Sequence, residues 1–402
     1  MKLDSAPFAY DPATYWPGLS AATAGLDTPF GAVSVPALAH NAHDMLRRSA
    51  GTTIRVASKS IRVRGVIESV LALPGYQGVL AYTLPEALWL AETVDDVVVG
   101  YPSVDRAAIE RLGSSEKLAS RVTLMVDSTA QLDVVDAVLG AKRETIRVAL
   151  ELNASWRSPL LGYLGVYRSP VQGVEDARAL AREIAARPGF RLVGIMAYEA
   201  QIAGQPDDTG SGDAVIRWMQ RRSTEELRER RGAIVGAVRD VADLEFVNGG
   251  GTGSLEYTAS DPAVTETTAG SGLLAGHLFD LYRHFTLAPA AAFALEVVRR
   301  PADDIVTVLG GGWIASGPPV ASRQPLPAWP TGLATLAREG AGEVQTPLQG
   351  AAAKSLSLGD RVWFRHAKSG ELAERVDRYH LTSGDTIVGE AATYRGEGKS
   401  FL

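Results

Sequence analysis

The 402-residue sequence predicts an α/β fold, a (β/α)8 TIM-like barrel followed by a C-terminal β domain. Short apolar segments alternate with helical segments up to about residue 286, and beyond that point strand-like segments are separated by glycine, proline and polar turns. The length accommodates a barrel of about 250 residues and an appendage. We therefore expect an N-terminal arm over 1–26, the barrel over 27–286 and the β-rich domain over 287–402.

The barrel prediction rests on eight apolar runs with helical segments between them. Strands connected through helices form right-handed crossovers and a parallel sheet, and eight such units close into a barrel. An open doubly wound sheet is the structural alternative. The expected strands are 54–58, 78–82, 96–99, 121–126, 146–152, 191–197, 244–248 and 263–267, and helical candidates include 128–139, 172–186 and 214–241.

The segments before and after the predicted barrel lack its alternation of strands and helices. Residues 1–26 are rich in proline, aromatics and alanine, and 30–35 form a short extended segment before Pro36 opens a helix. In the C-terminal part we expect strands at 293–298, 305–309, 361–365 and 385–391. The proline-containing stretch 318–350 is interpreted as a surface excursion.

Composition excludes several classes of function. The chain has no cysteine, so disulfides, thiolate metal sites and cysteine nucleophiles are excluded. A net charge of -6 gives no reason to expect nucleic acid or an anionic membrane as a partner. The sequence has neither a signal-peptide pattern at its start nor an apolar run of about 18 residues, so we expect a cytoplasmic protein.

Lys59 lies at or just past the end of the first expected strand, whose buried residues would include Ile54, Val56 and Ala57. Active sites of parallel barrels assemble at the carboxyl ends of the strands, and a lysine held there can be desolvated enough to form a Schiff base. A solvated strand terminus is the alternative.

A glycine-rich segment, Asn248-Gly249-Gly250-Gly251-Thr252-Gly253-Ser254, follows the seventh expected strand. Consecutive glycines let backbone N–H groups converge on an anion, and the threonine and serine add hydroxyl donors. A plain tight turn is the alternative. In a barrel this segment and Lys59 converge at one mouth, and a lysine together with a phosphate cradle suggests pyridoxal 5'-phosphate.

Two further residues are candidates for the same mouth. Tyr198 ends the sixth expected strand, where it can pack on a cofactor ring or hydrogen-bond it; an interface tyrosine is the alternative. Glu266 on the eighth strand either faces the cofactor or pairs with a neighbouring basic residue.

Several of these motifs occur in a familiar order: Thr28-Pro29, a helix with Asn41, Val56-Ala57-Ser58-Lys59, residues 81–87, Leu164-Gly165-Val166, Ala197-Tyr198-Glu199 and 248–252. With them the sequence resembles the alanine-racemase-fold (fold type III) pyridoxal-phosphate enzymes over roughly residues 27–400. Within that fold it most resembles the D-threonine aldolase and D-serine dehydratase branch, the amino acid deaminase/aldolase family. The resemblance implies a barrel followed by a β domain, a homodimer, Lys59 as the Schiff-base residue, Gly250, Gly251, Thr252 and Gly253 around the phosphate, and Tyr198 near the ring.

The sequence departs from this pattern at the expected metal site. Metal-dependent members carry a histidine followed two residues later by cysteine or aspartate, whereas here His366 is followed by Lys368. A protonated ammonium cannot ligate a metal, so His366 alone remains as a divalent-metal ligand. Either Glu371 or Asp377 completes a metal site, or His366 acts directly as acid or base with Lys368 as an electrostatic partner. A purely structural histidine is the third interpretation.

A second departure is Tyr163, which occupies a position where relatives usually have arginine. The loss of that cation would change the charge near the cofactor.

The resemblance implies a lyase that acts on a small β-hydroxy amino acid. The sequence favours aldol cleavage of a D-3-hydroxy amino acid to glycine and an aldehyde, with His366 taking the β-hydroxyl proton. The alternatives are a D-serine or D-threonine dehydratase with Lys59 as base, and an amino acid racemase whose second base would be a tyrosine such as Tyr379 or Tyr394. A non-catalytic pyridoxal-phosphate carrier and a barrel that binds another phosphorylated ligand are further alternatives.

Overall fold

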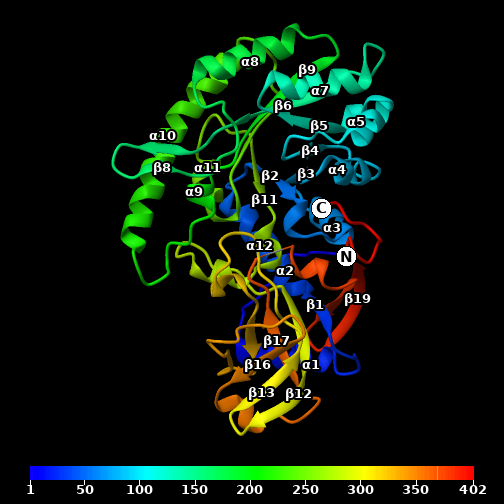
Figure 1. The fold of residues 1–402 in the computed structure, drawn as a ribbon, viewed down its shortest axis with the longest axis vertical. Helices are drawn as coiled ribbons and strands as arrows, with labels where there is room; N and C mark the ends of the chain where they lie inside the picture. The colour runs from blue at the N-terminus through cyan, green and yellow to red at the C-terminus, as the bar shows by residue number, and fades with distance from the viewer. Residues whose placement is uncertain (369) are drawn as a thin grey trace. The chain divides into compact units, whose positions relative to one another are not determined.

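The computed structural model describes residues 1–368 and 370–402, which divide into two compact units (Figure 1). The barrel unit comprises Met45–Lys59, Leu71–Gly270 and Phe401–Leu402. The sheet unit comprises Met1–Asp44, Ser60–Val70 and Ser271–Ser400. Each unit is therefore assembled from segments that are distant in the sequence.

Among the described residues, eight parallel strands close into a barrel, in the order β2-β3-β4-β5-β6-β9-β10-β11. Every strand overlaps one of the apolar runs, so the predicted barrel is confirmed. The strands are β2 (Thr53–Ala57), β3 (Tyr76–Ala81), β4 (Val97–Val99), β5 (Val122–Val126), β6 (Ile146–Leu152), β9 (Phe190–Ala197), β10 (Phe246–Gly249) and β11 (Glu266–Ala269).

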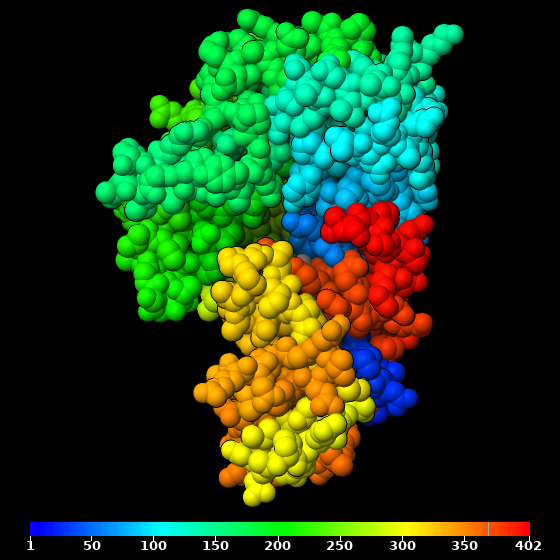
Figure 2. All heavy atoms as spheres, in the orientation of Figure 1, coloured from blue at the N-terminus to red at the C-terminus, as the bar shows by residue number. Residues whose placement is uncertain are grey.

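Helices follow most barrel strands and begin at polar capping residues. The side chains of Thr83, Asp105 and Ser115 accept backbone N–H groups at the first turns of α4, α5 and α6, which fixes where each helix starts. In the space-filling view the green segment, which includes α8 and α10, forms a broad outer surface (Figure 2). The helices are α4 (Leu84–Leu90), α5 (Arg106–Gly113), α6 (Glu116–Arg121), α7 (Thr129–Leu139), α8 (Val174–Ala186), α9 (Ala200–Ala203), α10 (Asp213–Arg239) and α11 (Leu255–Ala259).

The barrel interior is apolar around Phe246 and polar beside it. Side chains from β4, β5, β6, β9 and β10 form one buried cluster, including Val98, Met125 and Phe246. Arg55 of β2 lies with its guanidinium carbon 5.3 Å from the Phe246 ring centroid and makes two hydrogen bonds to Glu266 of β11, at 2.7 and 2.9 Å. Of the two alternatives for Glu266, the structure shows pairing with a basic residue.

The sheet unit contains, among its described residues, a nine-stranded sheet in which β1 lies between β12 and β18. Strand β1 pairs antiparallel with β12 and parallel with β18. Trp16 of α1 and Trp363 of β17 are buried in the apolar cluster of this unit. The strands are β1 (Phe30–Ser34), β12 (Ala291–Ala302), β13 (Ile305–Leu309), β14 (Leu326–Trp329), β15 (Ala334–Thr335), β16 (Gln345–Gln349), β17 (Arg361–Arg365), β18 (Arg378–Ser383) and β19 (Thr386–Ala392).

Shorter elements complete the two units. The remaining strands are β7 (Trp156–Ser158) and β8 (Gly162–Leu164), a separate antiparallel hairpin in the barrel unit. The remaining helices are α1 (Pro12–Ala22), α2 (Val35–Arg48), α3 (Arg64–Leu71) and α12 (Ser271–Leu274), and the 3-10 turns are η1 (Ser58–Ser60), η2 (Thr252–Ser254), η3 (His277–Leu281), η4 (Ala321–Arg323), η5 (Ala351–Ser355) and η6 (Leu372–Glu374). None of the helices in the described part of the chain has the length and apolar character that crossing a membrane requires.

The interpretation of 318–350 as a surface excursion was wrong. This stretch contributes β14, β15 and β16 to the sheet, and β16 pairs with β13 along five residues, from Gln345 opposite Leu309 to Gln349 opposite Ile305. Burial alternates along β16 and Pro347 lies within it, so the strand lacks a continuous apolar run. Antiparallel strands with one solvated face are expected to show this weaker pattern.

Candidate active site

Lys59 lies at the carboxyl end of β2, in the 3-10 turn η1 (Ser58–Ser60). The Ser58 hydroxyl donates a hydrogen bond to the Leu80 carbonyl at 3.1 Å, which ties this turn to β3. The Lys59 side chain is exposed, and its Nζ donates to the Tyr101 hydroxyl at 3.0 Å. Tyr101 follows β4, so its side chain spans from the end of that strand to the end of β2. The turn thus presents a primary amine at the mouth of the barrel.

A guanidinium lies between two tyrosine rings at this mouth. The Arg168 guanidinium carbon is 5.1 Å from the ring centroid of Tyr101 and 4.7 Å from that of Tyr198. Its Nη1 also lies 3.7 Å from Oε1 of Glu151 on β6. A cation is therefore present although Tyr163 is not arginine. The Tyr163 hydroxyl instead donates to the Val166 carbonyl at 3.0 Å.

The ionisation of these groups is shifted from its ordinary range. Burial by itself would raise the pKa of Tyr101, but Lys59 and Arg168 outweigh it and the pKa is lowered. Burial raises the pKa of Tyr198, and Arg168 offsets only part of that effect. Burial also raises the pKa of Glu151 to about 7, with Arg168 acting in the opposite direction. Of these three groups, Glu151 is the one whose pKa lies near neutral pH.

The glycine-rich loop follows β10, and β11 separates that strand from β2 in the closed barrel. Because parallel strands end at the same edge, the loop and Lys59 belong to one mouth. Gly250 has φ +90° and donates its N–H to Glu199 Oε2 at 2.8 Å. A Cβ on Gly251 would lie 2.9 Å from the Ala203 Cβ and 3.4 Å from Cε2 of Tyr198, so this loop packs closely against α9 and Tyr198.

The turn η2 (Thr252–Ser254) continues the loop and is buried. The Thr252 carbonyl accepts a hydrogen bond from Arg48 Nη2 at 2.7 Å, and Arg48 also binds Glu256 at 2.5 and 2.9 Å. The Gly250 N–H is already bonded to Glu199, so an anion cradle in this loop has to use the amides and hydroxyls that follow it. An amine and such a cradle at one mouth can bind a phosphorylated carbonyl compound.

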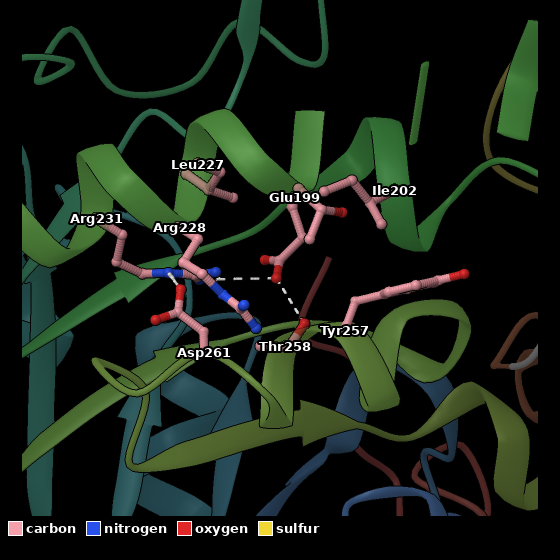
Figure 3. Close-up of a pocket in the computed structure, with 9 residues that line it drawn as sticks. Glu199, Ile202, Leu227, Arg228, Arg231, Tyr257, Thr258 and Asp261 are labelled. Atoms are coloured by element: carbon pink, nitrogen blue, oxygen red, sulfur yellow. Dashed lines mark hydrogen bonds and ion pairs between the residues drawn. The ribbon is translucent and has the colours of Figure 1, made fainter. Parts of the chain in front are cut away.

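Behind the loop lies a buried ionic cluster, which we call the Arg231 cluster, formed by Glu199, Arg231, Thr258 and Asp261 (Figure 3). Arg231 Nε donates to Asp261 at 2.9 Å, and its Nη1 lies 3.7 Å from Glu199 Oε1. The Thr258 hydroxyl donates to the same Glu199 oxygen at 2.7 Å. The cavity that these residues line has a volume of only about 10 Å³, which suffices for about one water molecule. On this side the ionic cluster supports the loop, and the cavity is too small for a ligand of amino-acid size.

His366 belongs to the sheet unit, directly after β17. It is 1% exposed, and neither ring nitrogen has a hydrogen-bond partner among the described residues. Burial lowers the pKa of His366 to about 3, and Arg365 and His277 add to the effect. The ring is therefore neutral at pH 7, and its nitrogens are among the buried polar atoms of this unit that have no hydrogen-bond partner in the described part of the chain.

The donor set around His366 does not complete a metal site. In residues 1–368 and 370–402 there is no group of three or more His, Cys, Asp or Glu side chains that could hold a metal ion. Of the two proposed carboxylates, Asp377 accepts from Arg395 at 2.9 Å, and Glu371 accepts the Ser316 N–H at 3.1 Å. The described residues thus provide His366 as a single ligand and do not fit a divalent metal.

The sequence did not point to Tyr101, Arg168 or Glu151. Tyr101 follows a three-residue strand in Gly100-Tyr101-Pro102, which has the composition of a turn, and Arg168 lies beyond the β7–β8 hairpin. The one usable signal was Glu151, a carboxylate inside an otherwise apolar strand. Burying a carboxylate costs desolvation free energy, so a carboxylate at a buried position is a candidate functional residue.

Comparison with known proteins agrees with this architecture. The family model described as "Alanine racemase, N-terminal domain" matches residues 33–235, just over half of the chain. A 3-hydroxy-D-aspartate aldolase from Paracoccus denitrificans (strain Pd 1222) is 27% identical over 239 residues, which cover 57% of this chain and 53% of the relative. The chain thus spans about half the length of the curated relatives it matches.

Solved structures also share the fold, among them an aldolase and a dehydratase. The D-threonine aldolase from Filomicrobium marinum has a TM-score of 0.77 at 20% identity and covers 93% of this chain and 96% of its own. The D-threo-3-hydroxyaspartate dehydratase from Delftia sp. HT23 has a TM-score of 0.71 at 19% identity, with coverages of 92% and 98%. At these identities the likeness concerns the fold alone. The extent of the family match, in contrast, is decisive: the chain belongs to the alanine racemase N-terminal domain family.

Proposed function

We propose that the protein is a pyridoxal 5'-phosphate-dependent lyase that cleaves a D-3-hydroxy amino acid to glycine and an aldehyde. The observation that carries the proposal is the pairing of Lys59, at the end of β2, with the glycine-rich loop at the end of β10, in one closed barrel. The curated relatives are named as aldolases of a 3-hydroxy-D-amino acid, which supports the choice of substrate class.

The residues at the mouth fit the cofactor that the family implies. Lys59 offers an exposed amine, and the close packing of Gly251 against Ala203 and Tyr198 leaves no room for a side chain at that position of the loop. Lys59 would hold the cofactor covalently, Gly251, Thr252 and Gly253 would hold its phosphate, and Tyr198 would flank its ring. When bound, pyridoxal 5'-phosphate supplies an electron sink for the bond that breaks at the substrate Cα.

The chain's own groups then have to bind the substrate and move protons. Arg168 provides the positive charge at the mouth, which favours an anionic substrate. A base has to remove the β-hydroxyl proton, and we assign this role to His366 as the sequence suggested. Burial keeps its ring unprotonated at pH 7, as a base must be, although a pKa of about 3 makes it a weak one.

The donor set at His366 bears on the choice between cleavage and dehydration. Dehydration requires the β-hydroxyl to leave as water, a step that a divalent metal assists as a Lewis acid. Lys368 stands where the resemblance implies a second ligand, and the described residues supply no carboxylate cluster in its place. This favours aldol cleavage over the metal-assisted dehydratase. The resemblance also supports a homodimer, which light scattering on the purified protein tests.

The decisive experiment is product analysis. The purified protein is incubated with pyridoxal 5'-phosphate and a panel of D- and L-3-hydroxy amino acids, with and without EDTA. We expect glycine and an aldehyde from D-substrates, whereas ammonia and a keto acid would replace the proposal by the dehydratase. Borohydride reduction followed by peptide mass spectrometry should locate the cofactor on Lys59. Lys59→Ala should lose the visible Schiff-base absorbance, and Lys142→Ala, at an exposed lysine, should retain it.

A further inference from the structure

We propose that Tyr101 is the proton partner of Lys59: its hydroxyl oxygen takes a proton from Lys59 Nζ when the amine has to be neutral and returns it afterwards. The inference rests on the proposed function, because only there is Lys59 the reacting amine. It assigns a catalytic role to a residue that neither the sequence motifs nor the comparisons single out.

The geometry brings the two groups into direct contact. Tyr101 follows β4 and Lys59 follows β2, with β3 between these strands. The distance of 3.0 Å between Nζ and the hydroxyl oxygen is that of a hydrogen bond, so the proton moves without rearrangement of the backbone. The contact joins side chains from the ends of two strands whose register the barrel fixes.

The charges that face Tyr101 favour its phenolate form. Lys59 faces it from η1 and Arg168 from the segment after β8, and Tyr198 lies on the other side of the Arg168 guanidinium. Glu151 lies 3.7 Å from Arg168 Nη1, so one of the two cations also has a carboxyl neighbour. The two cations lower the pKa of Tyr101 against the effect of burial. The phenolate oxygen, unlike that of a neutral phenol, can accept the proton of an ammonium group.

The proton transfer balances within the pair. The Lys59 ammonium gives one proton to the Tyr101 phenolate, which leaves a neutral amine with a free electron pair and a neutral phenol. The neutral amine is the form that adds to a carbonyl carbon or removes a Cα proton. The reverse transfer restores the ammonium and the phenolate, so no other proton donor is needed. A purely structural hydrogen bond would make no such transfer.

The first test follows the ionisation of Tyr101 by NMR of ¹³Cζ-labelled tyrosine. The signal that Tyr101→Phe removes should titrate below the ordinary tyrosine value of about 10, and Lys59→Met should move its midpoint to higher pH. Tyr163→Phe removes a tyrosine hydroxyl bonded to a backbone carbonyl and should leave that midpoint unchanged. A midpoint at or above the ordinary value, or one that ignores Lys59→Met, overturns the proposal.

The second test measures the rate at which the Schiff-base absorbance appears after pyridoxal 5'-phosphate is added, as a function of pH. Tyr101→Phe should slow this rate at neutral pH by about 10²-fold, the lower end of the range for general acid–base catalysis, and should change its pH profile. A wild-type rate and profile in this variant, with its fold verified by circular dichroism, refute the role. If the wild type itself forms no band, the proposed function fails, and the NMR titration alone decides whether Tyr101 and Lys59 share a proton.

Discussion

Glu151→Gln should change how stability depends on pH. The free energy of unfolding of the variant, compared with that of the wild type, should be larger at high pH than at low pH. Glu151 is 2% exposed on β6, and burial raises its pKa from 4.5 to about 7, while Arg168 opposes this effect and Asp127 adds to it. The folded protein therefore holds this proton more tightly than the unfolded chain does. The resulting stability is fully present below pH 4.5 and is lost as the pH rises through about 7.

The magnitude follows from the shift. At about 1.4 kcal/mol for each pKa unit, the rise corresponds to about 3 kcal/mol, most of which is lost between about pH 5 and pH 9. Glu151→Gln removes the ionisation and keeps the shape of the side chain. The free energy of unfolding of the variant minus that of the wild type should therefore increase by about 2–3 kcal/mol across this interval.

Urea denaturation at a series of pH values measures this difference. Glu245→Gln is the matched control because Arg147 hydrogen-bonds Glu245 and lowers its pKa, so its contribution changes only at acidic pH. Between about pH 6 and pH 9 its difference from the wild type should be constant. A constant difference for Glu151→Gln over the same interval, or one that decreases, would refute a buried Glu151 whose pKa is raised to about 7.

Three further variants and one control test the support of the loop and the role of the histidine. Arg231→Met should lower the free energy of unfolding by about 3–5 kcal/mol, because it leaves buried carboxylates unpaired, and an unchanged urea midpoint would contradict this. Gly249→Ala places a methyl group 2.6 Å from Arg231 Nη1. This variant should lower the free energy of unfolding by about 1–3 kcal/mol and should bind the cofactor more weakly in an absorbance titration. Gly236→Ala is the control, because a methyl group there meets open space on α10, and it should not lower the free energy of unfolding. Equal losses of stability in Gly249→Ala and Gly236→Ala would refute the steric argument. His366→Asn should keep the Schiff-base band but slow aldol cleavage by about 10²-fold, and an unchanged rate would leave His366 a structural residue.

The sequence predicts the barrel well because its strands are buried on both faces. A run such as Val97–Val99 is buried at every position and shows as continuous apolar sequence. The sheet is harder to predict, since β16 alternates in burial and β18 (Arg378–Ser383) contains arginine, histidine and threonine. Strand β1 was expected to be extended, but its partners lie more than 250 positions away, as in the pair Phe30 and Ala294. Local pattern carries no information about such pairing.

In the candidate site, residues that directly follow a strand could be predicted from the sequence, whereas residues in irregular loops could not. Lys59 and the glycine-rich loop follow strands directly, so the rule that barrel sites lie at strand ends assigned them to one mouth. Arg168 follows the irregular hairpin after β6, where the sequence gives no register from which its position could be worked out. Glu199 was noticed only as the neighbour of Tyr198, yet it holds Gly250. Its role depends on a side-chain contact between two loops, which no periodicity encodes.

Strand β10 is held by ionic groups at both ends of its glycine-rich segment. At one end Asn248 donates to Glu266 at 2.8 Å and to Thr268 at 2.7 Å, within the network that includes Arg55. At the other end Gly250 donates to Glu199 of the Arg231 cluster. Both networks are buried, so they cost desolvation energy that an apolar core would not. These networks hold the glycine-rich loop in one conformation. A phosphate that binds such a preordered loop does not have to supply the free energy of ordering it. The buried charges of the barrel unit therefore fix the glycine-rich loop in place more than they add to stability.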